Sequence, residues 1–251
     1  MRAGERVLDV GTGTGEAAFL AARRVGRAGF VVGIDLSVGM LRSARAKAAR
    51  RGLTNVRFQR MDAAAPRLQE NSFDAIISSF GTPDGVYDGL AVFREWLRIL
   101  KPGGRLCFVE AAWGSVIDPI AKRTLAKYRV RDPSPELAAR RRLQAQIRKE
   151  RNRRSLINAD NPTKVARLMK DAGLHDIRTS TRRFLGTFPS ARTVLHIVLA
   201  VDVGNEYAEM SPEGRAGFRR EFLRALRPYE SSTGLRLPVR TVFFFGRKAL
   251  R

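Results

Sequence analysis

Four residues near the beginning of the chain have the types and the spacing of a binding loop: Asp9-x-Gly11-x-Gly13-x-Gly15. Glycine lacks a Cβ atom, so its backbone adopts positive φ angles and lets a ligand approach the main chain closely. The apolar run before this loop is typical of a buried strand, and residues 16–24 after it are typical of a helix. A ligand in the loop would therefore lie at a helix N-terminus, where backbone N–H groups face it. A turn that only packs a helix on a sheet would have the same composition.

A carboxylate follows the second apolar run of the chain. Residues 30–34 read as a strand that ends at Asp35, twenty positions after Gly15. A carboxylate at this place can accept hydrogen bonds from both hydroxyls of a ribose, and each such charge-assisted bond is worth roughly 1.5–3 kcal/mol. The nicotinamide fingerprint G-x-G-x-x-G spaces its glycines differently. The pattern therefore predicts a nucleoside-containing ligand other than a nicotinamide dinucleotide.

These residues need a layered scaffold, and the first half of the chain alternates strand and helix patterns. Strands are expected at 6–10, 30–35, 56–60, 73–78 and 104–110, and helices at about 16–26, 37–51 and 86–100. Such βαβ alternation predicts a parallel sheet with helices on both faces. Further on, the sequence predicts an edge strand at 175–184 and a last apolar strand at 237–246.

Five segments in this order resemble the class I S-adenosylmethionine (SAM) dependent methyltransferases, specifically the small-molecule group that includes the ubiquinone and menaquinone biosynthesis enzymes. The segments are VLDVGTGTG at 7–15, GIDLS at 33–37, MDA at 61–63, FDAIISSF at 73–80 and LKPGGRL at 100–106. The resemblance covers about residues 6–113. It implies a Rossmann-like α/β fold with a seven-stranded sheet in the order 3-2-1-4-5-7-6, the last strand antiparallel.

The resemblance also implies SAM as the cofactor and assigns residues to its parts. The glycine loop would hold the methionyl end, with Asp9 bracing the loop or contacting the amino group, and Asp35 would hold the ribose. Leu36, Met40, Asp62 and Ala63 would surround the adenine, and Ser79 and Phe80 would lie beside the sulfonium. The full set expected to bind the cofactor is Asp9, Gly11, Thr12, Gly13, Gly15, Asp35, Leu36, Met40, Asp62, Ala63, Ser79 and Phe80.

The chain is expected to form one core with two insertions. The core comprises residues 1–113, 161–185 and 237–251, and the helical cap insertions are 114–160 and 186–236. Both insertions follow carboxyl ends of strands, where ligands bind in open α/β sheets, so they are expected to meet above the cofactor as a substrate cap. Family members usually carry N-terminal helices that close over the cofactor. The sequence lacks them, so either another segment provides the lid or the start is truncated.

Methyl transfer depends on alignment of donor and acceptor, and orientation alone supplies roughly 7–11 kcal/mol. A general base is therefore not obligatory, although a weakly acidic acceptor would benefit from one. The candidates are His196, Glu110 and Tyr229, although the apolar context of His196 favours the alternative of a core histidine over a base. Two histidines and one cysteine do not make a zinc site, so no metal is expected. The single cysteine, Cys107, is expected to pack in the core.

The charge of the chain allows two interpretations. The net charge is +23, and 39 of the 47 basic residues are arginines distributed over most helical segments. A solvated arginine-rich surface and a dedicated polyanion site both fit this composition. The basic helical run 136–154 contains no Phe, Tyr or Trp, and no NPPY-type tetrapeptide follows the fourth strand. Nucleic acid is therefore not expected as a partner.

The sequence contains one cysteine, no apolar stretch of 18 residues, and a core strand already within the first 15 residues. These features predict a cytoplasmic protein without a leader or a membrane span, and a homodimer is compatible with them. The expected activity is SAM-dependent transfer of a methyl group to an O, N or C atom of a small apolar or aromatic acceptor. The alternatives are an RNA methyltransferase and a non-catalytic SAM-binding scaffold.

Overall fold

A computed structural model describes residues 1–82, 88–112, 116–153, 157, 159–200 and 202–250. The chain divides into two compact units, and each unit combines segments that are distant in sequence. Unit 1 consists of Met1–Ala111, Arg151–Arg182 and Thr241–Arg251, and unit 2 consists of Ala112–Glu150 and Arg183–Arg240.

The strands of the chain form one sheet in the order β3-β2-β1-β4-β5-β8-β6, with β7 paired to β8. The strands are β1 (Arg6–Val10), β2 (Phe30–Asp35), β3 (Val56–Arg60), β4 (Phe73–Ser79), β5 (Leu100–Ala112), β6 (His175–Phe188), β7 (Glu230–Ser231) and β8 (Gly234–Arg247). This order confirms the expected one, with β8 as the strand between β5 and β6. The expected number of seven strands is wrong, because Glu230 and Ser231 pair with Leu235 and Gly234 in a short hairpin. Two polar residues carry no apolar alternation, so the sequence gives no signal for β7.

Strands β1 to β5 pair with one another in parallel. The end of β8 meets the beginning of β5, where the Lys248 amide donates to the Gly104 carbonyl at 2.9 Å and the Gly103 amide donates to the Lys248 carbonyl at 3.2 Å. Strand β8 therefore runs antiparallel to β5, as expected.

The helices of the described residues include the three that the sequence analysis expected in the first half of the chain and the expected basic helical run, with small shifts at their ends. They are α1 (Glu16–Val25), α2 (Val38–Arg50), α3 (Gly89–Ile99), α4 (Ile117–Tyr128), α5 (Pro135–Arg153), α6 (Pro162–Asp171), α7 (Ala191–Leu199), α8 (Asp202–Ala208), α9 (Pro212–Leu226) and the 3-10 helix η1 (Arg227–Tyr229). Ser37 caps α2 by accepting a hydrogen bond from the Met40 amide at 3.3 Å. None of these helices is both long and apolar enough to cross a membrane.

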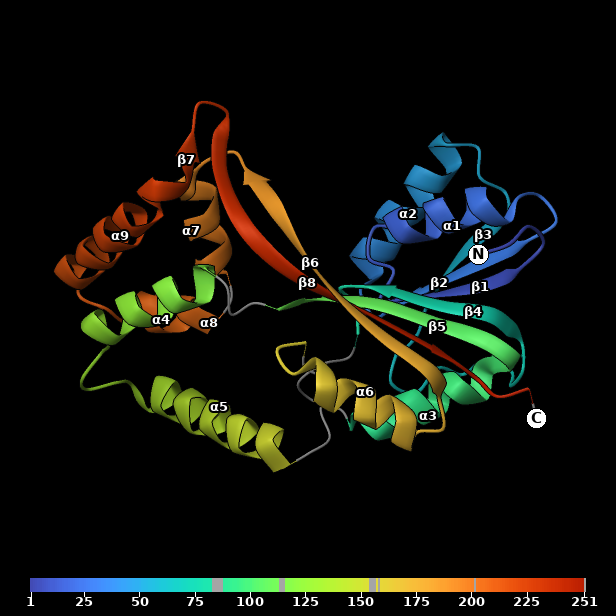
Figure 1. The fold of residues 1–251 in the computed structure, drawn as a ribbon. Helices are drawn as coiled ribbons and strands as arrows, with labels where there is room; N and C mark the ends of the chain where they lie inside the picture. Colours follow the sequence, from blue (N-terminus) through green and yellow to red (C-terminus); the bar gives the residue numbers. More distant parts are fainter. Residues whose placement is uncertain (83–87, 113–115, 154–156, 158, 201, 251) are drawn as a thin grey trace. The chain divides into compact units, whose positions relative to one another are not determined.

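Unit 1 is a three-layered α/β structure. Helices α1 and α2 lie on one face of its sheet, and α3 and α6 lie on the other (Figure 1). Val7, Leu8 and Val10 of the central strand β1 are fully buried, as expected for a parallel strand that is covered on both faces. Under α3, the ring of Phe108 stacks on that of Phe244 with centroids 4.6 Å apart. This buried core holds rigid the strand ends from which the binding loops emerge.

Unit 2 is helical and has its own apolar core. Helix α4 from the first insertion packs against α9 from the second, and Phe218 and Phe222 of α9 are fully buried and stacked on each other. The two insertions therefore fold together, although about 30 residues of unit 1 separate them in sequence.

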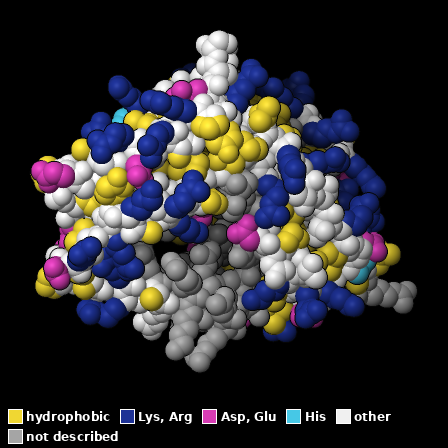
Figure 2. All heavy atoms as spheres, turned by 60° about the vertical axis from the view of Figure 1, so that its left-hand side comes forward, with side chains coloured by type: hydrophobic (Ala, Val, Ile, Leu, Met, Phe, Trp, Pro, Cys, Tyr) yellow, Lys and Arg dark blue, Asp and Glu magenta, His cyan; other side chains and the backbone are white. Residues whose placement is uncertain are grey.

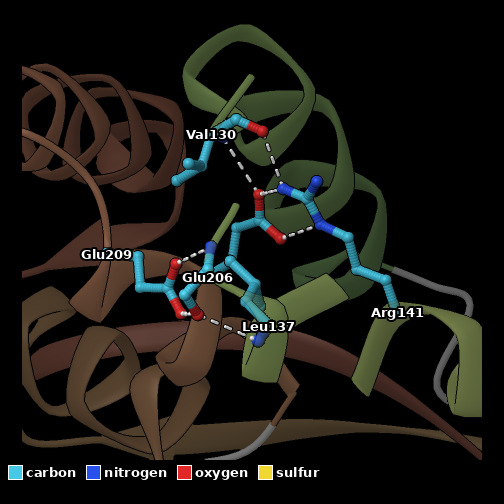
Figure 3. A network of polar contacts seen from close by, with 6 residues as sticks. Val130, Leu137, Arg141, Glu206 and Glu209 are labelled. Carbon is cyan, nitrogen blue, oxygen red and sulfur yellow. Dashed lines mark hydrogen bonds and ion pairs between the residues drawn. The ribbon is translucent and has the colours of Figure 1, made fainter. Parts of the chain in front are cut away.

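A polar network joins the two halves of unit 2 (Figure 3). Glu206 of α8 is only 6% exposed, and it forms a two-point ion pair with Arg141 of α5. The same carboxylate accepts from the Val130 amide at 3.0 Å, and Arg141 donates to the Val130 carbonyl at 2.9 Å. Directly after the end of α8, Glu209 accepts from the amide of Ser134 at 2.9 Å. These carboxylates fix the segment between α4 and α5.

Candidate functional site

The glycine loop opens onto a cavity of about 610 Å³ in unit 1, at the carboxyl ends of β1, β2 and β4. Eleven of the twelve residues expected to contact a cofactor line it: Asp9, Gly11, Thr12, Gly13, Asp35, Leu36, Met40, Asp62, Ala63, Ser79 and Phe80. We refer to this space as the loop cavity. Tertiary structure thus brings together residues from four segments of the chain.

Gly15 is the residue of that set that does not line the loop cavity. It is the N-cap of α1 with φ +91°, and a Cβ atom there would lie 2.6 Å from the ring of Phe19. Its role in the described structure is therefore to let the loop turn into the helix and pack on Phe19, which corrects the expectation of a contact position. The sequence could not separate these two needs, because both select glycine.

Close backbone packing holds the loop in place. Gly11 has φ +63°, and a Cβ atom there would lie 2.5 Å from the carbonyl oxygen of Gly81. The Thr12 amide donates to the Ile34 carbonyl at 2.9 Å, which ties the loop to the end of β2. Gly13, in contrast, has φ +54° with no atom near the position of its absent Cβ. The packing of the loop on Gly81 thus requires glycine at position 11, whereas at position 13 the space beside the backbone is open.

Asp35 connects the loop to the end of β2. One carboxylate oxygen accepts from the Gly13 amide at 2.9 Å, and the other accepts from the Ser37 amide at 2.8 Å. A carboxylate has about four acceptor positions, so each oxygen keeps one for a ligand in the loop cavity. Asp35 can therefore hold the loop and bind two hydroxyl groups at the same time.

Asp9 is the buried acidic residue of the loop cavity, with 1% of its surface exposed. Burial raises the pKa of its carboxyl from an ordinary 3.8 to about 7, although hydrogen bonds from the Thr12 hydroxyl and the Ala18 backbone act in the opposite direction, and the nearby Asp35 raises it further. The Thr12 hydroxyl donates to it at 2.6 Å. A cationic group bound near Asp9 would favour its ionised form.

Three large apolar side chains lie on the surface of the loop cavity. Leu36, Met40 and Phe80 are 54%, 47% and 56% exposed, which is unusual for such side chains in a folded domain. Phe80 also has φ +57°, and a left-handed conformation of a non-glycine residue is strained and occurs often at functional sites. An apolar ligand would cover these surfaces.

The loop after β3 completes the loop cavity. The Asp62 carboxylate accepts from the Ala64 amide at 2.8 Å, and the indole of Trp96 donates to the Ala63 carbonyl at 2.8 Å. Both bonds fix the turn at 62–64. Trp96 is buried on α3, so the core itself positions this wall.

Of the three candidate bases, Glu110 is the one in unit 1, and His196 and Tyr229 belong to unit 2. Glu110 accepts from the amide of Thr82 at 3.1 Å and from its hydroxyl, and Thr82 lines the loop cavity. His196 is exposed on α7, so the alternative of a core histidine is wrong. Tyr229 is half-buried against the core of unit 2.

Seven further residues line the loop cavity that sequence reasoning did not assign: Thr14, Glu16, Ala17, Ser37, Met61, Gly81 and Thr82. Each is adjacent in sequence to an assigned position or lies one turn along α1, so extension of each motif by one or two residues would have found them. The Lys47 ammonium donates to both Thr14 and Glu16 at 2.9 Å. This contact of α2 with α1 has no sequence signal, because 31 residues separate its partners.

The donor set of the loop cavity fits SAM. Two acceptor positions on Asp35 suit a ribose, exposed Leu36 and Met40 suit an adenine, and the buried carboxyl of Asp9 suits an ammonium group. A volume of about 610 Å³ is within the ~300–1,000 Å³ range of small-molecule and cofactor sites.

Comparisons with known proteins agree with this geometry. The family model described as "Methyltransferase domain" matches residues 1–173. Aklanonic acid methyltransferase DauC from Streptomyces is 41% identical over 110 residues, which are 43% of this chain and 48% of that protein. Ubiquinone/menaquinone biosynthesis C-methyltransferase UbiE from Idiomarina loihiensis is 40% identical over 111 residues, 44% of each chain. This chain therefore spans about half the length of the curated relatives it matches.

The crystal structure of the YcgJ protein from Bacillus subtilis shares the fold. Its TM-score is 0.59 at 17% identity, and the match covers 99% of this chain and 93% of that one. At this identity the likeness shows the architecture alone.

Proposed function

The chain belongs to the methyltransferase domain family, and from that premise we propose that it transfers the methyl group of SAM to a small apolar or aromatic acceptor. The observation that carries this proposal is the loop cavity, where eleven expected cofactor contacts from four segments of the chain line one space. When bound, SAM supplies an electrophilic methyl group on a positively charged sulfur.

The residues of the chain would act mainly by binding and orientation. Asp35 would accept hydrogen bonds from two hydroxyl groups while its bonds to Gly13 and Ser37 hold the loop closed. Leu36 and Met40 would cover an aromatic base, and Phe80 would exclude water beside the reacting centre. Orientation of this kind supplies roughly 7–11 kcal/mol of the barrier reduction.

Glu110 is the candidate base that we favour, because its carboxylate holds Thr82 at the wall of the loop cavity. It would accept a proton from an acidic acceptor, or it would position Thr82 without proton transfer. A Glu110→Gln variant separates these roles. Loss of turnover with an unchanged pH profile supports positioning, and loss of the acidic limb of the profile supports a base.

We propose that the acceptor carries an aromatic or quinone-like ring, because the names of the relatives refer to aklanonic acid and to ubiquinone/menaquinone biosynthesis. Unit 2, with its independent apolar core, is the part of the chain that we expect to determine acceptor choice. The family match over residues 1–173 ends before the second segment of unit 2, which begins at Arg183.

The test has two stages. Calorimetry with SAM and with S-adenosylhomocysteine measures cofactor binding, and NAD serves as the unrelated nucleotide control. Radiolabelled methyl transfer to phenols, quinols and aromatic acids, compared with transfer to RNA, then measures activity. Binding without turnover on any acceptor would support the scaffold alternative, and absence of SAM binding would reject the proposal.

A further inference from the structure

Unit 1 contains a second cavity of about 270 Å³, which shares no lining residue with the loop cavity. Alternate residues of a strand lie on the same face of a sheet, and four strands contribute such pairs here. The pairs are Ala75 and Ile77 of β4, Arg105 and Cys107 of β5, Asp176 and Arg178 of β6, and Phe245 and Arg247 of β8. We refer to this space as the sheet cavity.

The sheet cavity lies on the less covered face of these strands. The neighbouring residues Phe108 and Phe244 point to the other face, where Phe93 and Trp96 of α3 pack on Phe108. In contrast, Ile77, Cys107 and Phe245 are only half-buried. The floor of the sheet cavity is therefore apolar and accessible.

The charged side chains around this floor are mostly cationic. Arg105 forms an ion pair with Glu5 at 2.5 Å, and Asp176 pairs with His175 at 3.2 Å. Within the described part of the chain, the exposed side chains of Arg178 and Arg247 take part in no hydrogen bond or ion pair, and both residues line the sheet cavity. Two guanidinium groups beside an apolar floor thus lack an anionic partner.

We propose that the sheet cavity binds a small apolar carboxylate, with its carboxylate on Arg178 and Arg247 and its hydrocarbon part on Ile77, Cys107 and Phe245. Arginine binds carboxylates through paired N–H donors, and these charge-assisted bonds are stronger than neutral ones. The volume of about 270 Å³ is slightly below the ~300–1,000 Å³ typical of ligand sites. The ligand is therefore a short-chain or single-ring acid.

Cys107 provides a built-in probe, because it is the single cysteine of the chain and lies in the floor of the sheet cavity. A neutral aromatic disulfide reacts with it only when the floor is accessible. Burial raises the pKa of the Cys107 thiol to about 11, so the rate is measured at about pH 9, where enough thiolate forms. Octanoate is the test ligand. As controls, 1-octanol has the same hydrocarbon chain without a charge, and inorganic phosphate is an anion without a hydrocarbon chain.

Octanoate is expected to slow the reaction of Cys107 saturably, whereas octanol and phosphate have little effect. The double variant Arg178→Gln/Arg247→Gln should weaken this protection by at least about tenfold. The control variant Arg24→Gln/Arg167→Gln removes the same charge from exposed sites of unit 1. Octanoate should protect Cys107 in this variant as it does in the wild type. Thermal unfolding and SAM calorimetry verify that each variant is folded.

Four results would overturn the proposal. Equal protection by octanol would show a purely apolar groove, and equal protection by phosphate would show an inorganic-anion site. If the control variant lost the protection by octanoate to the same extent, octanoate would be attracted non-specifically to a basic protein. Absence of both protection and calorimetric heat with octanoate would show that no site exists. None of these outcomes depends on SAM turnover, so the proposal fails independently of the proposed function.

Discussion

Asp35 has a double role in the loop cavity, because its carboxylate accepts two backbone hydrogen bonds and still has positions for a ligand. A carboxylate in this state is already oriented, so a bound ribose would cost little ordering of the side chain. The same bonds mean that its removal loosens the glycine loop as well as removing a ligand contact.

Asp35→Ala is expected to weaken SAM binding roughly 10- to 150-fold, equivalent to about 1.5–3 kcal/mol of lost charge-assisted hydrogen bonding. Isothermal titration calorimetry measures the change. Asp171→Ala, an exposed carboxylate at the end of α6, is the matched control and should bind as the wild type does. Unchanged affinity in the Asp35 variant would reject the ribose assignment.

Asp9 predicts a pH dependence of stability. Its folded pKa of about 7 is above the ordinary 3.8, so between these values the folded chain holds a proton that the unfolded chain has lost. The free energy of unfolding should therefore fall as pH rises from about 4 to about 7, by at most ~1.4 kcal/mol per pH unit from this group. The Asp9→Asn variant keeps an acceptor for the Thr12 hydroxyl but cannot titrate at this position. Its free energy of unfolding should therefore lack the pH dependence that Asp9 contributes.

Urea unfolding of both proteins at several pH values between 5 and 8 measures the difference, in which the titration of all other groups cancels. The Asn variant should gain stability relative to the wild type as pH rises. Parallel curves for the two proteins would show that Asp9 titrates normally.

At the scale of the element, the turn from β1 to α1 contains glycines with different physical constraints. Gly13→Ala should cost about 1–2 kcal/mol, the strain of a left-handed alanine, because nothing lies near its Cβ position. Gly11→Ala should cost clearly more, because its Cβ would lie 2.5 Å from a backbone oxygen of Gly81. Equilibrium unfolding in urea compares the pair, and equal costs would contradict the packing of the loop on Gly81.

Helix α5 shows that neighbouring arginines in one basic run are not equivalent. Arg141 pairs with the buried Glu206, whereas Arg142 is exposed. Arg141→Gln leaves a buried carboxylate without its partner and should destabilise unit 2 by about 3–5 kcal/mol. Arg142→Gln removes the same charge and should change stability by less than about 0.5 kcal/mol. Thermal unfolding distinguishes them, and similar melting temperatures would show that the ion pair contributes little.

At the scale of the whole molecule, the net charge of +23 is distributed. Lys and Arg side chains are spread across the face shown in Figure 2 rather than gathered in one patch. Scattered cations attract polyanions without base recognition, and residues 136–154 offer no aromatic side chain for stacking.

RNA affinity is therefore expected to be no better than roughly 10⁻⁴–10⁻⁶ M at physiological salt. Fluorescence anisotropy over a salt series measures it, and neutralisation of Arg142, Arg148 and Arg151 should leave methylation of small acceptors within a few-fold of the wild type. Arg141 is kept, because its loss is expected to destabilise unit 2. Nanomolar binding that depends on RNA sequence and disappears in this variant would favour the RNA methyltransferase alternative.

The sequence by itself determined the α/β alternation and eleven of the residues that line the loop cavity, and the motifs that carry the family resemblance implied the strand order. These features follow from local signals, since apolar runs, glycine spacing and residues at strand ends lie within a few positions of each other. Eleven of the twelve assigned residues line the loop cavity for this reason.

Only the tertiary structure decided which of these residues serve the protein and which face a ligand. Gly15 packs on Phe19 instead of lining the loop cavity, and Arg141 pairs with the buried Glu206, 65 residues away in sequence. The sheet cavity likewise assembles from β4, β5, β6 and β8. Contacts between distant segments depend on the packing of whole elements, and that packing leaves no periodic trace in the residues that make them.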